Sequence, residues 1–210
     1  MSDMERDKIG RRILNDRPIV DETVSNRAVE LLQQHNKKTN TTNIQFHNPT
    51  HGERGEKISF GAAYAKFLQT HDFDPNERDA VRFISDPNLS YVMTRYRQNH
   101  DYWHVLTGLP PTVLGELALK WLELMQTGLP LAALSAIGGS LGAASGLSAK
   151  EREILIDIYI PWAIRVGGNM RKNALMCVYY EEELETDVDD LRKRVGIELA
   201  PTLKCASSGT

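Results

Sequence analysis

Cysteine is scarce in this sequence. Its 210 residues include only two cysteines, Cys177 and Cys205, which lie far apart and show no paired spacing. Disulfide-stabilised domains and thiolate metal sites both need several closely spaced cysteines. The sequence therefore indicates neither a disulfide framework nor a cysteine-based metal site, and it fits a reducing compartment.

A strong charge of one sign is also lacking. The 25 lysines and arginines nearly balance the 28 aspartates and glutamates, which leaves a formal charge of -3 at pH 7. Proteins that bind nucleic acid usually carry a basic patch, so this balance gives no reason to expect a nucleic-acid partner. With 41% hydrophobic and 25% charged residues, the chain is suited to one globular domain with a substantial core.

The sequence has no long apolar run without interruption. Residues 126–149 carry no charge, but glycines, serines and one proline dilute their leucines. Two short helical pieces therefore fit this segment better than one membrane-spanning helix. Four aliphatic residues recur in it at helical spacing, and they either line an apolar groove, rest on a bilayer surface or pack in the core. They are Leu131, Leu134, Ile137 and Leu141.

The first residues do not resemble a targeting signal. Residues 1–13 are charged and include acidic side chains, unlike a basic, acid-poor transit peptide or an apolar secretory signal. We expect a single domain over residues 14–200, with a polar loop at about 35–58 that lacks apolar periodicity. A flexible tail is expected at 201–210.

Helical periodicity dominates the rest of the chain. Apolar residues at spacings of three and four predict one helix that starts at Ser85 or Asp86 and stops at Gly108, and a second over about 112–127. Each is followed by the same Gly-Leu-Pro terminator. The chain is therefore expected to be an all-α, single-domain helical bundle. Further helices are expected over 60–70, from Ser148 onward with a kink at Pro161, and from about 173 to 195.

Side chains suited to metal binding gather near the end of the predicted helix that stops at Gly108 and at the start of the predicted helix over about 112–127. His100 and His104 lie four residues apart, so they share a helical face and can present two imidazoles to one ion. Asp101 and Glu116 supply oxygen atoms nearby. If the two helices pack antiparallel through their short connection, Glu116 faces His104. The spacing therefore predicts a metal site between two adjacent helices.

Other interpretations of these residues stay open. Histidines four apart on an apolar face also occur as core pairs with satisfied hydrogen bonds. The pattern matches the metalloprotease helix motif only in part, because Asp101 stands where that motif has glutamate and is one methylene shorter. Beyond Pro161, Arg165 is open either to a surface ion pair or to a substrate carboxylate.

The motif belongs to a longer set of recognisable residues. The set consists of residues 95–104, Gly108, Pro110, Gly115, Glu116, Lys120, Trp121, and residues 126–130, 160–163 and 178–181. Through these residues the chain resembles the coenzyme Q biosynthesis protein four family from about Leu14 to Ala200. The specific signature of that family is His-Asp-x-x-His-x(11)-Glu, which is matched here by His100, Asp101, His104 and Glu116.

The resemblance implies an all-α, membrane-associated protein of ubiquinone biosynthesis with an apolar groove that faces lipid. In eukaryotes the family is peripheral on the matrix side of the mitochondrial inner membrane, and a bacterial member would lie on the cytoplasmic membrane face. The implied partners are a polyprenylated benzoate or quinone intermediate, the membrane surface and other coenzyme Q biosynthesis enzymes. A second copy of the chain, in a homodimer, is a further candidate partner. The resemblance favours lipid contact for the apolar positions of residues 126–149.

The implied activity is that of a carboxy-lyase. The family is implicated in removing the C1 carboxylate of a 4-hydroxy-3-methoxy-5-polyprenylbenzoate, in one version with oxidation at the same carbon, and in organising the enzyme complex that builds the quinone. By the motif, Zn2+ is held by His100, Asp101, His104 and Glu116, and Glu116 and Asp101 also have catalytic roles. Two alternatives remain: a non-catalytic scaffold that binds prenyl lipids around a structural metal, and a metal-dependent hydrolase.

Overall fold

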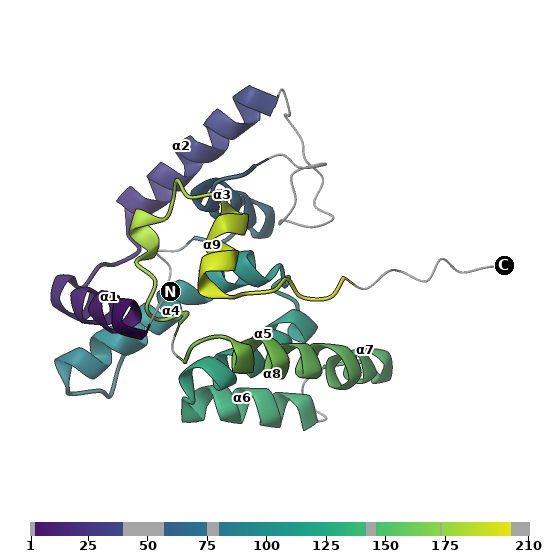
Figure 1. Cartoon of the computed structure of the whole chain (residues 1–210). Helices are drawn as coiled ribbons and strands as arrows, with labels where there is room; N and C mark the ends of the chain where they lie inside the picture. Colours follow the sequence, from purple (N-terminus) through teal and green to yellow (C-terminus); the bar gives the residue numbers. More distant parts are fainter. Residues whose placement is uncertain (1–2, 40–56, 75–79, 142–145, 173, 203–210) are drawn as a thin grey trace.

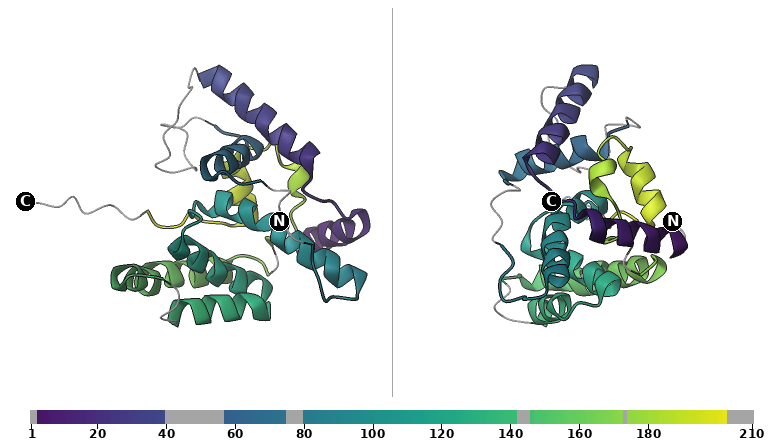
Figure 2. Two further views of the ribbon diagram at one scale, coloured as in Figure 1. Left: turned by 180° about the vertical axis from the view of Figure 1, so that it is seen from behind. Right: turned by 90° about the vertical axis from the view of Figure 1, so that its left-hand side faces the viewer.

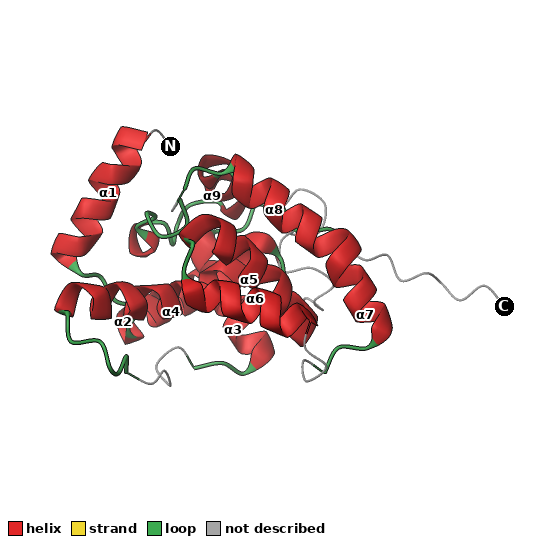
Figure 3. Ribbon diagram, turned by 90° about the horizontal axis from the view of Figure 1, so that it is seen from below, coloured by secondary structure: helices red, strands yellow, loops and turns green. Residues whose placement is uncertain are grey.

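The structure of this chain is a computed structural model. The regular elements among its described residues are helices. The one β-bridge within the described residues, between Ser59 and Asp187, stands alone. Figure 3 shows the helical elements and their connections. The expected all-α class is therefore confirmed. The structure describes residues 3–39, 57–74, 80–141, 146–172 and 174–202.

The central helix, α4, lies between two groups of helices. On one side α3 packs against α2, α4 and α9, and on the other α5 packs against α4, α6 and α8. Figure 1 shows the two groups at opposite ends of the molecule, and the views in Figure 2 show the same division. The α-helices are α1 Asp3–Asp16, α2 Glu22–Thr39, α3 Phe60–His71, α4 Pro87–Thr107, α5 Val113–Thr127, α6 Pro130–Leu141, α7 Ala149–Ile154, α8 Ile160–Asn169 and α9 Val188–Val195.

Aromatic side chains on α4 form the centre of the core. The ring of Tyr102 packs against Phe60 and Tyr64 of α3, with centroids 5.2 and 4.5 Å away. Trp103 is fully buried, and its indole nitrogen donates to the hydroxyl of Tyr180 at 3.1 Å. Each such ring pair contributes about 0.5–1.5 kcal/mol beyond the burial of its area. These contacts fix the rotation of α4 and so decide which of its side chains face α5.

The ends of α4 and α5 follow the expected signals. Asp86 caps α4 by accepting from the backbone N–H groups of Asn88 and Leu89, each at 2.9 Å. Gly108 and Gly128 end the two helices in the left-handed conformation, with φ angles of 74° and 64°. Both Gly-Leu-Pro terminators are therefore confirmed.

The connection between α4 and α5 is held tightly at Gly115. A Cβ atom built on Gly115 would lie 2.0 Å from the carbonyl oxygen of Pro110, which is far closer than real Cβ atoms come. Thr112 caps α5 by accepting from the backbone N–H of Gly115 at 3.2 Å. Glycine therefore lets the loop fold back onto the first turn of α5, and Glu116 is held beside the end of α4.

The last helical region expected from the sequence is correct only in its final part. The sequence predicts helices over about 173–195, and α9 confirms this for Val188–Val195. Residues 174–187, in contrast, form turns and a short 3-10 segment at Tyr180–Glu182. The hydroxyl of Tyr180 donates to the carbonyl of Leu175, and the carboxylate of Asp187 accepts from the first N–H groups of α9. These local bonds satisfy the backbone without a continuous helix, while the apolar residues still reach the core.

Three other expected boundaries differ from the structure or fall outside it. Residues 3–13 of the charged first segment belong to α1, whose Arg12 pairs with Glu182 at 2.9 Å. Residues 35–39 of the polar loop expected at about 35–58 are helical, because α2 continues to Thr39. Residues 40–56 of that loop, and residues 203–210 of the expected tail, lie outside the described residues.

At the kink expected at Pro161, the structure has a π-helical segment. Residues Leu155–Tyr159 form this segment between α7 and α8, and Pro161 sits in the first turn of α8. A proline ring clashes with the carbonyl group four residues earlier in a regular α-helix. The wider π turn relieves that clash, so the chain continues in helical form through the proline.

The aliphatic residues of α6 face away from the protein. Leu131, Leu134 and Ile137 are 51%, 73% and 47% exposed, whereas Ala132 and Ala136 are fully buried. The small residues therefore pack against α5 and the large ones face outward, which excludes the core-helix interpretation for these three positions. The side chain of Leu141 lies outside the described residues. No described helix is both long and apolar enough to cross a membrane.

We expect Glu181→Gln to destabilise the fold strongly. Arg95 is 1% exposed, and its guanidinium contacts both carboxylate oxygens of Glu181, one of them at 2.9 Å. Removing the charge of Glu181 leaves a buried cation without its partner, at a cost of about 3–5 kcal/mol in urea denaturation. The control is Glu182→Gln, whose partner Arg12 is exposed. Equal stability of the two variants would contradict this assignment.

Candidate metal centre

Two rows of polar side chains face each other between α4 and α5. On α4 the row contains Tyr96, His100 and His104, each four residues from the next. On α5 it contains Glu116, Lys120 and Glu123, also on one helical face. The helices run antiparallel, so that the end of one row meets the start of the other.

Three of these side chains converge on one point. The Nε2 atoms of His100 and His104 lie 3.2 Å apart, and each lies 3.0 Å from a different oxygen of Glu116. Around a tetrahedral zinc ion with bonds of about 2.0–2.1 Å, neighbouring ligand atoms lie about 3.3 Å from one another. The spacing of these atoms therefore suits a small metal ion. The expected facing of Glu116 and His104 is confirmed.

The hydrogen bonds of the opposite ring nitrogens indicate that both Nε2 atoms are acceptors. Nδ1 of His104 lies 2.9 Å from the carbonyl oxygen of Leu109, which only accepts, so this nitrogen carries the hydrogen. Nδ1 of His100 lies 2.7 Å from a carboxylate oxygen of Glu123. In the neutral rings, Nε2 then presents a lone pair toward Glu116. Lone pairs that converge in this way need a cation between them.

A proton on Nε2 of His100 supplies a positive charge between these lone pairs, but it does not satisfy all of them. Burial lowers the pKa of His100, but hydrogen bonds to Glu116 and Glu123 outweigh it and raise the pKa to about 9. Burial likewise raises the pKa of Glu116, yet the two histidines lower it well below its usual value. A proton on Nε2 of His100 leaves Nε2 of His104 facing a carboxylate oxygen. One metal ion at the centre would accept a lone pair from each of the three groups.

Burial of the three side chains differs in a way that suits an open metal site. His104 is 1% exposed and His100 is 18% exposed, whereas the side chain of Glu116 is 37% exposed. A catalytic metal keeps one position for water or substrate, while a structural metal is closed. The side of the centre at Glu116 is therefore the side from which a ligand can approach.

The structure does not bring Asp101 into this cluster. Among the described residues, the group whose ligand atoms lie within 4.8 Å of one another contains His100, His104 and Glu116. Asp101 is buried and lies one residue further around α4, about 100° from His100. Its role as a ligand and as a catalytic group stays a prediction, as do the metal roles of the other three.

Sequence reasoning gave no role to Glu123. This residue is fully buried on α5, and its carboxylate accepts from the hydroxyl of Tyr96 and, at 2.7 Å, from Nζ of Lys120. Burial would raise the pKa of Glu123, but His100 and Lys120 lower it. Its spacing of seven residues from Glu116 is the signal that places both on one face.

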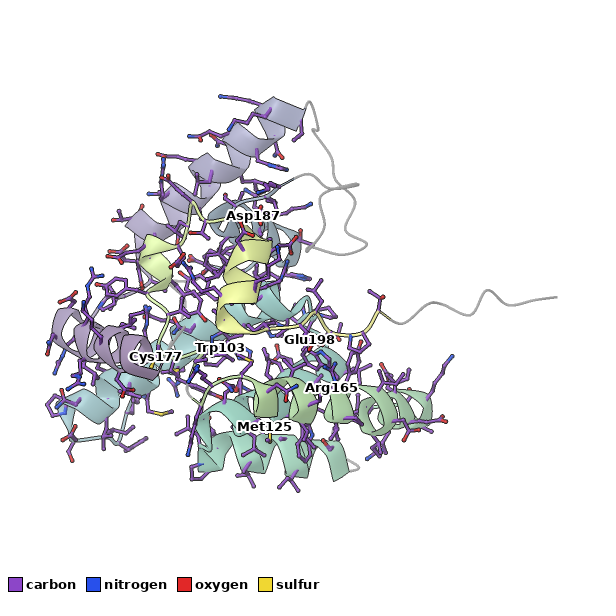
Figure 4. The ribbon with its side chains drawn as sticks, viewed as in Figure 1. Trp103, Met125, Arg165, Cys177, Asp187 and Glu198 are labelled. Carbon is purple, nitrogen blue, oxygen red and sulfur yellow. The ribbon has the colours of Figure 1, made fainter. Side chains whose placement is uncertain are left out.

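Arg165, which the sequence left open to a substrate carboxylate, lies elsewhere. Its guanidinium binds Glu198 at 2.7 Å, and both side chains are more than half exposed. Figure 4 shows Arg165 on α8 and Glu198 on the segment that follows α9. Arg165 therefore forms the surface ion pair, one of its two sequence interpretations.

A family model and several curated proteins match this chain. The model is described as Coenzyme Q (ubiquinone) biosynthesis protein Coq4, and it matches residues 42–201. The ubiquinone biosynthesis protein COQ4, mitochondrial, of Arthroderma otae is 41% identical over 96% of this chain and 64% of its own length. The COQ4 homolog of Drosophila pseudoobscura pseudoobscura, also named mitochondrial, is 45% identical over 67% of this chain and 51% of its own. The chain thus spans about half to two thirds of these relatives.

A solved structure supports the fold. A crystal structure of a protein from Nostoc punctiforme PCC 73102 superposes with a TM-score of 0.52 and covers 81% of each chain. Its sequence identity to this chain is 20%. At that identity the likeness concerns the arrangement of the helices alone.

We expect His100→Ala and His104→Ala each to abolish stoichiometric metal binding. Each change removes one of the converging nitrogen atoms, and a site with three protein ligands tolerates such a loss poorly. Elemental analysis of purified protein measures the effect, with circular dichroism to show that the helices are retained. The control is His35→Ala on α2, which should keep native metal content. Full metal occupancy in both test variants would show that these histidines do not form the site.

Proposed function

Because the chain belongs to the coenzyme Q (ubiquinone) biosynthesis protein Coq4 family, we propose that it is a zinc-dependent carboxy-lyase of that pathway. The proposed substrate is a 4-hydroxy-3-methoxy-5-polyprenylbenzoate, which loses its C1 carboxylate. The observation that carries the proposal is the convergence of His100, His104 and Glu116 on one point with an open side. All three lie within the part of the chain that the family model matches.

The chemistry assigns different tasks to these side chains. A bound zinc ion supplies Lewis acidity toward an oxygen atom of the substrate. His100 and His104 would hold the ion from the buried side, and Glu116 would complete the set at the open side. In the reaction the bond between C1 and the carboxylate carbon breaks, carbon dioxide leaves, and the electron pair stays on C1. In the proposal a water molecule supplies the proton, and the ionised carboxylate of Glu116 relays it to C1, which balances the reaction.

The oxidative version of the reaction needs a further component. Oxidation at C1 removes electrons from the ring, and zinc has no redox chemistry to accept them. That version therefore requires an electron acceptor or dioxygen besides the proposed site. The version in which a proton replaces the carboxylate requires only the groups named above.

The scaffold alternative draws support from an apolar cavity. This cavity has a volume of about 350 Å³ and lies between α1, α4 and the turn after α5. Its lining includes Ile13, Tyr91, Val92, Leu129 and Met176. An apolar hollow of this size suits part of a lipid chain. A protein that binds a prenyl lipid there and uses its metal only to join α4 to α5 would need no catalytic Glu116.

We also propose that α6 contacts the membrane surface, in line with a peripheral protein of the matrix side of the mitochondrial inner membrane. Relatives of the chain are named mitochondrial. The support within the structure is the outward face of α6, formed by Leu131, Leu134 and Ile137 on a helix without charged residues. Exposed aliphatic residues along one helix are typical of interfacial contact.

We expect Glu116→Gln to separate catalysis from scaffolding. The change preserves the shape of the side chain but removes its titratable group, so carbon dioxide release should fall by about 10²- to 10⁴-fold. The control is Glu153→Gln on the exposed side of α7. Quinone synthesis at native rate in cells that carry only Glu116→Gln, at matched protein abundance, would favour the scaffold.

We expect Leu134→Glu to weaken binding to phosphatidylcholine vesicles without unfolding the protein. Leu134 is 73% exposed, so a charged side chain there stays in water and should change stability by less than about 0.5 kcal/mol. Vesicle flotation and thermal melting measure the two effects. Ile19→Glu, at another exposed site, should bind vesicles as the native protein does. Unchanged vesicle binding by Leu134→Glu would refute contact through α6.

A further inference from the structure

We infer that Glu123 is a positioning residue for His100: it fixes the ring with hydrogen on Nδ1 and directs Nε2 toward Glu116. The inference deepens the proposed function and rests on the metal centre named there. It concerns a contact that lies behind the three converging groups and that none of the proposed catalytic steps uses.

The contacts of Glu123 place it as a fixed acceptor. Its side chain is 0% exposed, and its Oε1 lies 2.7 Å from Nδ1 of His100. Its Oε2 accepts from Nζ of Lys120 at 2.7 Å and from the hydroxyl of Tyr96. Three donors thus hold the carboxylate from two helices. A buried carboxylate held in this way cannot turn aside without losing several hydrogen bonds.

Two distances decide which form of His100 the surroundings favour. If Nδ1 carried a lone pair, Lys120 could donate to it, but Nζ of Lys120 is 3.4 Å away. The carboxylate oxygen of Glu123 is closer, at 2.7 Å, and it would repel such a lone pair. The shorter contact therefore selects hydrogen on Nδ1. The lone pair of the neutral ring then resides on Nε2, on the side of Glu116.

The two histidines differ in what orients them. His104 donates to the backbone carbonyl of Leu109, in the loop that Gly115 holds tightly. His100 depends on a side chain instead. When a residue that hydrogen-bonds the far ring nitrogen of a metal-binding histidine is mutated, metal affinity typically falls by about 10- to 100-fold. His104 therefore serves as an internal reference, because a change at residue 123 leaves its own partner in place.

The test compares Glu123→Met with Gln126→Met. Both variants remove a fully buried polar group from α5, but the side chain of Gln126 binds the carbonyl of Gly167 on α8 and does not touch His100. Nuclear magnetic resonance of the ring nitrogens, on metal-free protein above the His100 pKa of about 9, reads which nitrogen carries hydrogen. Titration with Zn2+ gives the affinity.

In the native protein and in Gln126→Met, both histidines should carry hydrogen on Nδ1. In Glu123→Met we expect His100 to populate the other tautomer while His104 is unchanged, and Zn2+ affinity to fall by about 10- to 100-fold. If Glu123→Met does not fold, Glu123→Asp serves in its place. It keeps the charge beside Lys120 but withdraws the carboxylate by about one carbon–carbon bond, so the same direction is expected.

Native tautomers of His100 in the folded Glu123 variant would overturn the inference. So would native Zn2+ affinity in that variant. A native protein that binds no Zn2+ would instead defeat the proposed function. The tautomer measurement needs no metal, so it would still decide the role of Glu123 in that case.

Discussion

Two imidazoles and a carboxylate converge in this protein because the turn between α4 and α5 is short and closely packed. The carbonyl of Pro110 lies against Gly115, where any side chain would collide with it. Leu109 in the same turn accepts the hydrogen bond that orients His104. One loop thus sets the start of α5, the position of Glu116 and the tautomer of His104. A wider turn would separate the carboxylate from both histidines.

The polar row between α4 and α5 is tolerated because its members satisfy one another. Removing charged groups from water costs several kcal/mol for each ion unless partners replace the lost hydration. Here Glu123 meets Lys120, Tyr96 and His100 at once, and Glu116 meets both histidines. The aromatic side of α4, with Tyr102 against α3, supplies the apolar contacts that offset the remaining cost. One side of α4 thus packs in the core and stabilises the fold, while its other side carries the polar groups of the candidate metal centre.

Local signals in the sequence predicted the parts of the fold that depend on local interactions. Asp86, Gly108 and Gly128 bound α4 and α5 because caps and left-handed glycines act within one turn. The facing of Glu116 and His104 followed from a short connection. Residues 174–187 were mistaken for helix because their apolar spacing serves long-range packing on α4, which no local pattern distinguishes. Glu123 was missed for a related reason: two of its three partners, Tyr96 and His100, lie on another helix, and its residue type alone does not show that it is buried. The outward face of α6 was left open, since periodicity shows which residues share a face but not what covers it.

Anomalous X-ray diffraction at the zinc edge tests the central claim most directly, with crystals of the native protein grown in the presence of Zn2+. The account predicts one strong peak between α4 and α5, at about 2.0–2.2 Å from Nε2 of His100, Nε2 of His104 and an oxygen of Glu116. Well-ordered side chains at this position without a zinc peak between them would contradict it.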